Sequence, residues 1–236
     1  MKIIVLAILL THSFFISNAQ TKNLITSRTS VINIDGETSD WNGYSSNYNE
    51  NSKSTYIIIN DNQKIYFLFK FSEKASQMKV LRAGLEINID TTGKNNFPIS
   101  VIFPFSIDRL NNDIYSHSVT GIKPTMDFEA NKEMLINKSN NIRLIGFNSG
   151  YSDIMINKTN TLNIESCIKF NNQNELILEM SIPIKLFFES KIKNYKYPFA
   201  IQFSMMGLPI DATSTEDPKL FENNNFSVKS KLALPN

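Results

Sequence analysis

Four aromatic residues have the type and the placement needed to stack on a flat or ring-shaped ligand. Trp41 and Tyr44 lie in one short segment, and Trp41 is the only tryptophan of the 236-residue chain. Tyr195 and Tyr197 lie two residues apart in a polar connector. An aromatic ring offers a wide apolar face, and a tyrosine hydroxyl or an indole N–H adds a hydrogen bond. We therefore expect these four residues to be the candidate ligand-binding residues.

Each of these residues also has a structural alternative. Trp41 can close one end of a hydrophobic core with its N–H bonded to a neighbour, because large aromatic side chains are mostly buried. Tyr195 and Tyr197 can anchor an ordinary loop. The sequence leaves both alternatives open.

Two carboxylates open loops that contain glycine and are the candidate metal ligands. Asp35 directly precedes Gly36, and Asp90 precedes the loop that contains Gly93. Calcium is bound by several oxygen ligands that loops bring together. The alternative is that each aspartate caps a turn, since the sequence has no dense run of alternating aspartates. We expect no resident cofactor, with calcium at Asp35 and Asp90 as the exception to test.

The residues needed for catalysis are sparse. His117 is the only histidine after the first 19 residues, and Cys167 has no histidine beside it. Glu175 and Glu179 fall on the polar face of one expected strand, which favours a solvated surface. No nucleophile elbow, zinc spacing or phosphate-binding glycine loop is present. We therefore expect that the protein is not an enzyme.

The first 19 residues are typical of a secretory signal peptide. Lys2 is followed by an apolar run from Ile3 to Leu10, and Ser17-Asn18-Ala19 is a small-residue cleavage site. We therefore expect export to the periplasm or the extracellular space. No later run is apolar and long enough to span a membrane.

Charge and cysteine content exclude two further classes. The net charge of +2 offers no footprint for nucleic acid. Cys167 is the only cysteine, so no internal disulfide can form. The fold must depend on its own core, for which the chain has 17 phenylalanines.

The clearest structural signal is a hairpin near residue 60. Two β-branched and aromatic runs, residues 56–59 and 64–71, flank a polar turn. Alternation places Ile65, Phe67 and Phe69 on one face and leaves the other face half apolar. Such a strand lies inside a sheet and is packed on both sides.

Short alternating segments recur along the rest of the chain and predict an all-β fold. The expected strands are 31–34, 85–90, 98–103, 142–147, 153–157, 162–170, 175–182 and 199–205. Residues 72–82 have helix-like composition but form a short segment. Residues 106–141 are the least regular region, which holds either a helix around 127–135 or a long loop. We expect an antiparallel β-sandwich with immunoglobulin-like or jelly-roll-like layering, long loops and little helix. Its expected boundaries are a lead-in at 20–30, one domain at 31–207 and a loosely held tail at 208–236.

Three short motifs stand in an order that resembles family 9 carbohydrate-binding modules and the DOMON-like domains. They are Ile34-Asp35-Gly36 with Asp40-Trp41, Asn60-Asp61 with Ile65-Tyr66-Phe67, and Ile87 to Gly93 leading to Phe97 and Pro104. The resemblance covers about residues 31–105, and it is greatest to secreted members that stand alone behind a signal peptide. Ile182-Pro183 resembles a step that precedes the last strands of these domains.

The resemblance implies a β-sandwich whose concave face stacks aromatic rings on a sugar, with structural calcium. The sugar clamp of the family uses a pair of tryptophans, which this chain lacks. Glycan binding is the leading expectation. The second is a protein-interaction or structural module of the periplasm or cell envelope with no sugar site. The third is a haem-binding DOMON domain for electron transfer, with His117 and either Met126 or Met205 as axial ligands.

Overall fold

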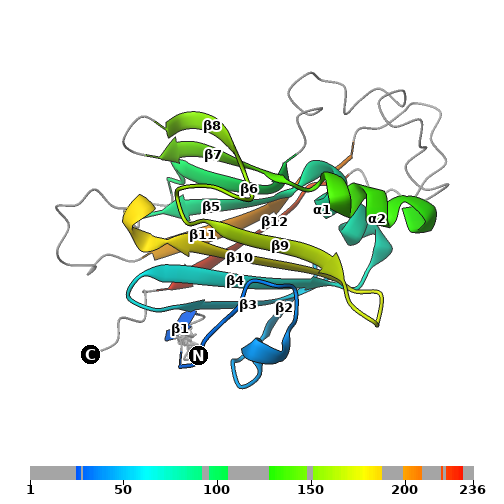
Figure 1. Cartoon of the computed structure of the whole chain (residues 1–236), viewed down its shortest axis with the longest axis horizontal. Coiled ribbons are helices and arrows are strands. Elements are labelled where there is room, and N and C mark those ends of the chain that lie inside the picture. Colours follow the sequence, from blue (N-terminus) through cyan, green and yellow to red (C-terminus); the bar gives the residue numbers. More distant parts are fainter. Residues whose placement is uncertain are drawn as a thin grey trace, which may run out of the picture.

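Two six-stranded β-sheets face one another in the computed structural model (Figure 1), which describes residues 25–27, 29–91, 96–105, 128–147, 151–187, 199–208, 219 and 222–230. Sheet A has the order β1 (Ile25–Ser27), β3 (Ser54–Asn60), β4 (Lys64–Phe71), β10 (Leu176–Pro183) and β9 (Glu165–Phe170), with β2 (Asn47–Asn49) beside β3. Sheet B has the order β12 (Asn224–Ser230), β11 (Phe199–Met205), β5 (Leu85–Asp90), β6 (Ile99–Phe105), β7 (Asn141–Phe147) and β8 (Tyr151–Asn157). Apart from the parallel pair β1–β3, neighbouring strands are antiparallel. The predicted antiparallel β-sandwich is confirmed.

The β3–β4 hairpin forms where the alternation predicts it, and its turn is fixed by one aspartate. The Oδ1 atom of Asp61 accepts the backbone N–H groups of Gln63 and Lys64, each at 2.7 Å. This local bonding is the reason that aspartate is favoured in turns. The turn sets the register of β4 against β3 and thereby selects which side chains face sheet B.

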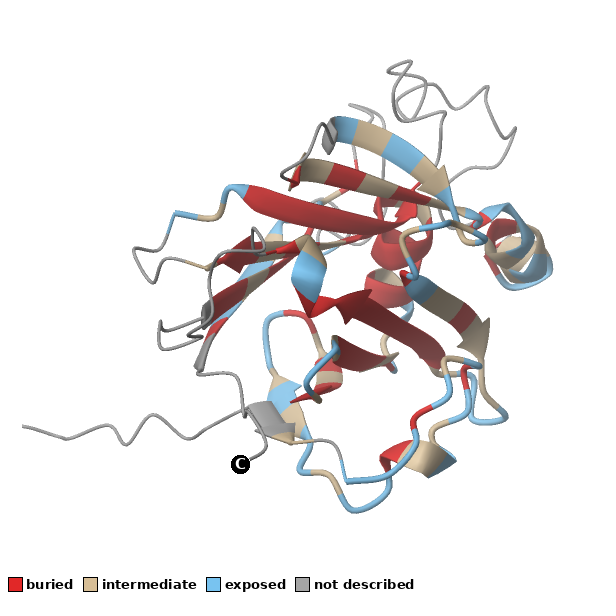
Figure 2. Cartoon of the chain, turned by 60° about the vertical axis from the view of Figure 1, so that its left-hand side comes forward, coloured by how far each residue is buried: buried red, intermediate tan, exposed pale blue. Residues whose placement is uncertain are grey.

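The inner faces of the two sheets form the main core. Phe69 of sheet A meets Phe203 of sheet B edge to face, with ring centroids 4.9 Å apart. The ring of Tyr56 lies 6.2 Å from that of Phe69. The central strands are buried along most of their length (Figure 2). The predicted inward faces of residues 65–71, 85–90 and 175–182 are confirmed.

Two helices close one end of the sandwich (Figure 1): α1 (Lys74–Ala83) and α2 (Phe128–Lys138). Helix α1 ends at Gly84, whose N–H donates to the carbonyl of Val80 at 2.9 Å and whose φ of +81° suits only glycine. Both helices match the helix-like stretches of the sequence. Within the described ranges, neither is long and apolar enough to cross a membrane.

Three segments near the ends of the expected domain differ from their expected secondary structure. The lead-in contains β1, and residues 31–34 pair with no strand. The expected tail contains β12, which pairs with β11 over seven residues. The ring of Phe226 in β12 lies 4.9 Å from that of Phe203, and Lys79 of α1 donates to the Asn224 side chain at 2.7 Å. The polar composition that suggested a tail belongs to an edge strand, in which one side faces solvent.

Candidate functional site

Part of the outer face of sheet A is covered by residues 29–44, which we call the N-terminal strap. The strap contains one turn of 3₁₀ helix, η1 (Ser39–Trp41). Its side chains Ile32 and Trp41 form a second apolar cluster with side chains of sheet A, namely Ile57, Ile59, Tyr66, Leu68 and Ile177. The half-apolar outer face that the sequence predicted for β4 is therefore packed against the strap.

A buried glutamate fastens the strap to the sheet. Glu179 of β10 is fully buried, and its two oxygens accept the Trp41 Nε1–H at 2.7 Å and the Gly36 backbone N–H at 2.5 Å. Burial raises the pKa of Glu179 to about 7, although these hydrogen bonds act in the opposite direction. The expectation that Glu179 lies on a solvated surface is wrong, because the strap covers this part of β10.

Two further contacts hold the strap in place. Glu37 forms an ion pair with Lys169 of β9 at 2.5 Å. Asp40 accepts both the backbone N–H and the side-chain amide of Asn33, at 3.0 and 2.8 Å. The strap is thus attached to sheet A and is also bonded within itself.

Trp41 and Tyr44 both belong to the strap and its apolar cluster. Trp41 is 2% exposed, so its ring has no free face on which a ligand can stack. Tyr44 is half-buried, and its hydroxyl lies 2.8 Å from the N–H of Thr29 and 3.2 Å from that of Ser30. Burial acts to raise the pKa of Tyr44, but the hydrogen bonds with Ser30 and Thr29 outweigh it and lower the value to about 8. Neither residue enters the site that we propose below.

Several other predicted site residues lie outside the described residues. These are Tyr195, Tyr197, His117 and Met126. Met205, the alternative axial ligand for haem, is buried in the main core at the end of β11. The ligand-binding role of the two tyrosines stays a prediction.

The two candidate metal ligands lie on opposite faces of the sandwich. Asp35 is in the strap on sheet A, where its Oδ1 atom accepts the N–H of Glu37 at 2.8 Å. Asp90 is the last residue of β5 in sheet B and is fully buried. Because its neighbour Ile89 faces the main core, Asp90 lies on the opposite, outer side of sheet B. Packed sheets lie about 10 Å apart, so one cation cannot take both residues as ligands. Over the ranges that the structure describes, no three histidine, cysteine, aspartate or glutamate side chains gather as a metal site. Calcium at either aspartate alone stays a prediction.

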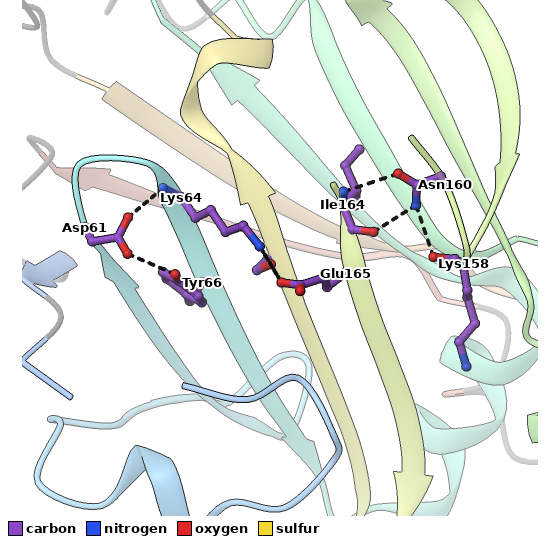
Figure 3. Close-up of polar contacts among 8 residues, drawn as sticks. Asp61, Lys64, Tyr66, Lys158, Asn160, Ile164 and Glu165 are labelled. Atoms are coloured by element: carbon purple, nitrogen blue, oxygen red, sulfur yellow. Dashed lines mark hydrogen bonds and ion pairs between the residues drawn. The ribbon is translucent and has the colours of Figure 1, made fainter. Parts of the chain in front are cut away.

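A polar network crosses one end of sheet A (Figure 3). Glu165 of β9 accepts hydrogen bonds from Lys64 and Ser181 on its Oε2 atom, both at 2.5 Å, and Tyr66 donates to Asp61 at 2.9 Å. Burial acts to raise the pKa of Glu165, but the hydrogen bonds from Lys64 and Ser181 lower it below its ordinary value. Because these groups are engaged with one another, the network serves to join β4, β10 and β9.

A single asparagine shapes the connection by which the chain passes from sheet B to sheet A. The Nδ2 atom of Asn160 donates to the carbonyls of Ile164 at 2.8 Å and Lys158 at 3.1 Å, and its Oδ1 atom accepts the N–H of Ile164 at 3.3 Å (Figure 3). These bonds form a turn that directs the chain into β9. Asn160 therefore has a structural role.

The outer face of sheet B has a different character, because polar side chains line up across its strands. One row, set by the strand register, is Gln202, Asn88, Ser100, Ile145 and Asp153. The adjacent row is Ser204, Glu86, Ile102, Arg143 and Met155. We call these two rows together the sheet B face. The sequence shows each strand as alternating, but only the register brings these residues into rows.

Hydrogen bonds link the two rows. Ser100 donates to Glu86 at 2.7 Å, and Asn88 donates to Ser204 at 3.3 Å. Asn88, Glu86 and Gln202 are half-buried, so part of each side chain stays in contact with solvent. The sheet B face is therefore a polar surface whose side chains are held in place by their neighbours.

Arg143 and an unexpected phenylalanine complete one side of this face. A register shift between Ile102 and Phe105 places Phe105 opposite Asn141, in line with the outward-facing Arg143. The Arg143 guanidinium lies 5.3 Å from the centre of the Phe105 ring and makes two hydrogen bonds to Asp153, at 2.9 and 2.7 Å. From the sequence, this strand was expected to end at residue 103, because the next residue is a proline and proline normally stops a strand. The register shift beyond that residue was therefore not predicted.

Comparisons with known proteins found a likeness among solved structures but none among family models or curated proteins. No protein-family model matches it, and no curated protein matches it. Among solved structures, a family 9 carbohydrate-binding module from Caldicellulosiruptor kristjanssonii in complex with glucose is similar at 12% identity and a TM-score of 0.40. The match covers 91% of this chain and 96% of the other. At this distance we take nothing from it about the ligand.

Proposed function

We propose that this chain is a non-catalytic glycan-binding module whose site is the sheet B face. The observation that carries the proposal is the pair of rows in which amide, carboxylate and hydroxyl side chains of neighbouring strands line up. The outer face of sheet A offers no equivalent surface where the strap covers it. We propose further that the chain is exported and acts in the periplasm or outside the cell.

The chemistry of the sheet B face suits a sugar. Sugar hydroxyls both donate and accept hydrogen bonds, as do the side-chain amides of Asn88 and Gln202, while Glu86 adds an acceptor. Ile145 and the exposed Met155 offer apolar surface for the C–H side of a sugar ring. Strands lie about 4.8 Å apart, so the four strands from β11 to β7 span about 14 Å, enough for a short oligosaccharide.

Aromatic stacking would come from the connector before β11. Tyr195 and Tyr197 directly precede this strand in the sequence. We propose that they stack on the sugar while the sheet B face bonds its hydroxyls. A site without a tryptophan pair should bind weakly, with Kd in about the micromolar to millimolar range.

The test is a glycan array with the chain, with and without calcium, followed by calorimetry on the best oligosaccharide. Gln202→Ala removes one hydrogen-bonding side chain and is expected to weaken binding about two- to tenfold, because a neutral hydrogen bond contributes about 0.5–1.5 kcal/mol. Tyr195→Ala and Tyr197→Ala are expected to weaken it by several-fold. All three variants should keep the thermal stability of the wild type.

The matched control is Gln173→Ala, in the β9–β10 turn, which belongs to sheet A. It should bind as the wild type does. If no glycan binds, or if Gln173→Ala weakens binding as much as Gln202→Ala, the sugar site is rejected. The protein-interaction module of the cell envelope then becomes the leading function.

A further inference from the structure

The charges of the sheet B face are unevenly balanced among its described residues. Asp153 neutralises Arg143, since two guanidinium nitrogens bond its two carboxylate oxygens at 2.9 and 2.7 Å. Asp90 also lies on this side of sheet B but is fully buried. Glu86 remains as a half-buried carboxylate whose Oε1 atom accepts a bond from the uncharged Ser100 at 2.7 Å.

Glu86 also has a central position. It pairs with Ser204 of β11 on one side and with Ile102 of β6 on the other, so it lies on an inner strand of sheet B and not at an edge. The hydrogen bond from Ser100 holds its Oε1 atom and limits the movement of the side chain. A ligand that lies across the two rows must therefore pass over a positioned negative charge.

We propose that Glu86 is a specificity-determining residue, which makes the sheet B face prefer glycans that carry a free amino group and reject those that carry a carboxylate. This inference rests on the glycan site proposed above. The ligand class it names is the amino sugars, whose protonated amine donates hydrogen bonds to a carboxylate.

The physical reason is the difference between a charged and a neutral hydrogen bond. A bond between an ammonium group and a carboxylate is roughly twice as strong as one between neutral groups. A uronate in the same place sets two carboxylates beside one another, which is repulsive. Arg143 acts electrostatically on Glu86 as well, but two hydrogen bonds hold its guanidinium against Asp153, so it offsets only part of this repulsion.

The experiment is calorimetry of the full chain at pH 6 with three oligosaccharides of equal length, built from glucose, glucosamine or glucuronate. We expect the glucosamine oligomer to bind about tenfold more tightly than the glucose oligomer, which corresponds to about 1.4 kcal/mol. The glucuronate oligomer should bind more weakly than either. Raising the ionic strength should narrow these differences, because salt screens interactions between partly exposed charges.

Glu86→Gln is the decisive variant, because it removes the charge and keeps an oxygen that can accept from Ser100. In this variant the glucosamine oligomer should bind no more tightly than the glucose oligomer, and binding of the glucuronate oligomer should improve. Glu133→Gln, an exposed site on α2, removes one negative charge elsewhere and should leave the preference unchanged. Equal binding of the glucose and glucosamine oligomers, or a preference that survives in Glu86→Gln, overturns the inference and leaves the glycan site standing. Binding of none of the three overturns both.

Discussion

Replacing Phe69 with alanine is expected to lower the free energy of unfolding by about 3–5 kcal/mol. Phe69 is fully buried, and its ring lies edge to face against Phe203 at 4.9 Å. The substitution removes a large apolar side chain from the junction of the two sheets and leaves a cavity there. Because whole domains are stable by only about 5–15 kcal/mol, the loss is a large share of the total.

Urea denaturation measures this effect, and Tyr48→Ala is its control. Tyr48 is an aromatic residue of the edge strand β2 and is 56% exposed. An exposed substitution of this kind changes stability by about 0.5 kcal/mol or less. Equal losses in the two variants would mean that the core does not lie between the sheets as described.

Replacing Glu179 with alanine is the second substitution with a large expected effect, about 2–6 kcal/mol. It leaves the Trp41 Nε1–H and the Gly36 N–H buried without an acceptor, and each unpaired buried donor costs about 1–3 kcal/mol. The strap depends on both bonds, so the loss should also expose the second apolar cluster. Denaturation measures the first effect, and an increase in the solvent exposure of the only tryptophan, seen in its fluorescence, measures the second.

The same glutamate predicts how stability depends on pH. Its folded-state pKa is about 7, above the ordinary value of 4.5. The folded state therefore holds its proton more tightly than the unfolded state, and folding is favoured most below pH 4.5. This contribution is lost as the pH rises from 4.5 through about 7 and stays lost above it. Glu179→Gln does not titrate and should remove this part of the pH dependence.

Glu37→Ala is the control for the Glu179 variants. It breaks the exposed ion pair with Lys169, which contributes about 0–1 kcal/mol. Because Glu179 is intact in this variant, the loss of stability between pH 4.5 and about 7 should still be seen. If the dependence of stability on pH persists in Glu179→Gln, the assignment of this titration to Glu179 is wrong.

The amino-acid sequence by itself determined most of the central strands and the direction in which their side chains point. Alternation at residues 65–71 and 85–90 is a local property, because successive side chains of a strand point to opposite sides. The turn at Asp61 is local as well. The helix-like composition of residues 72–82 and 127–135 is local too, since composition over about ten residues sets helix preference, although the sequence left a long loop as the alternative for the second segment.

Only the tertiary structure decided what covers each face. Glu179 alternates with core residues in the same way as a solvated glutamate would, and its burial depends on a strap about 140 positions earlier in the chain. Phe105 reaches the outer side of sheet B because the bulge shifts its register against β7. The polar rows of the sheet B face join residues from five strands, and strand order and register are set by contacts between distant segments. The pattern along the chain predicts which side chains alternate within each strand, but it does not predict which strand lies beside it.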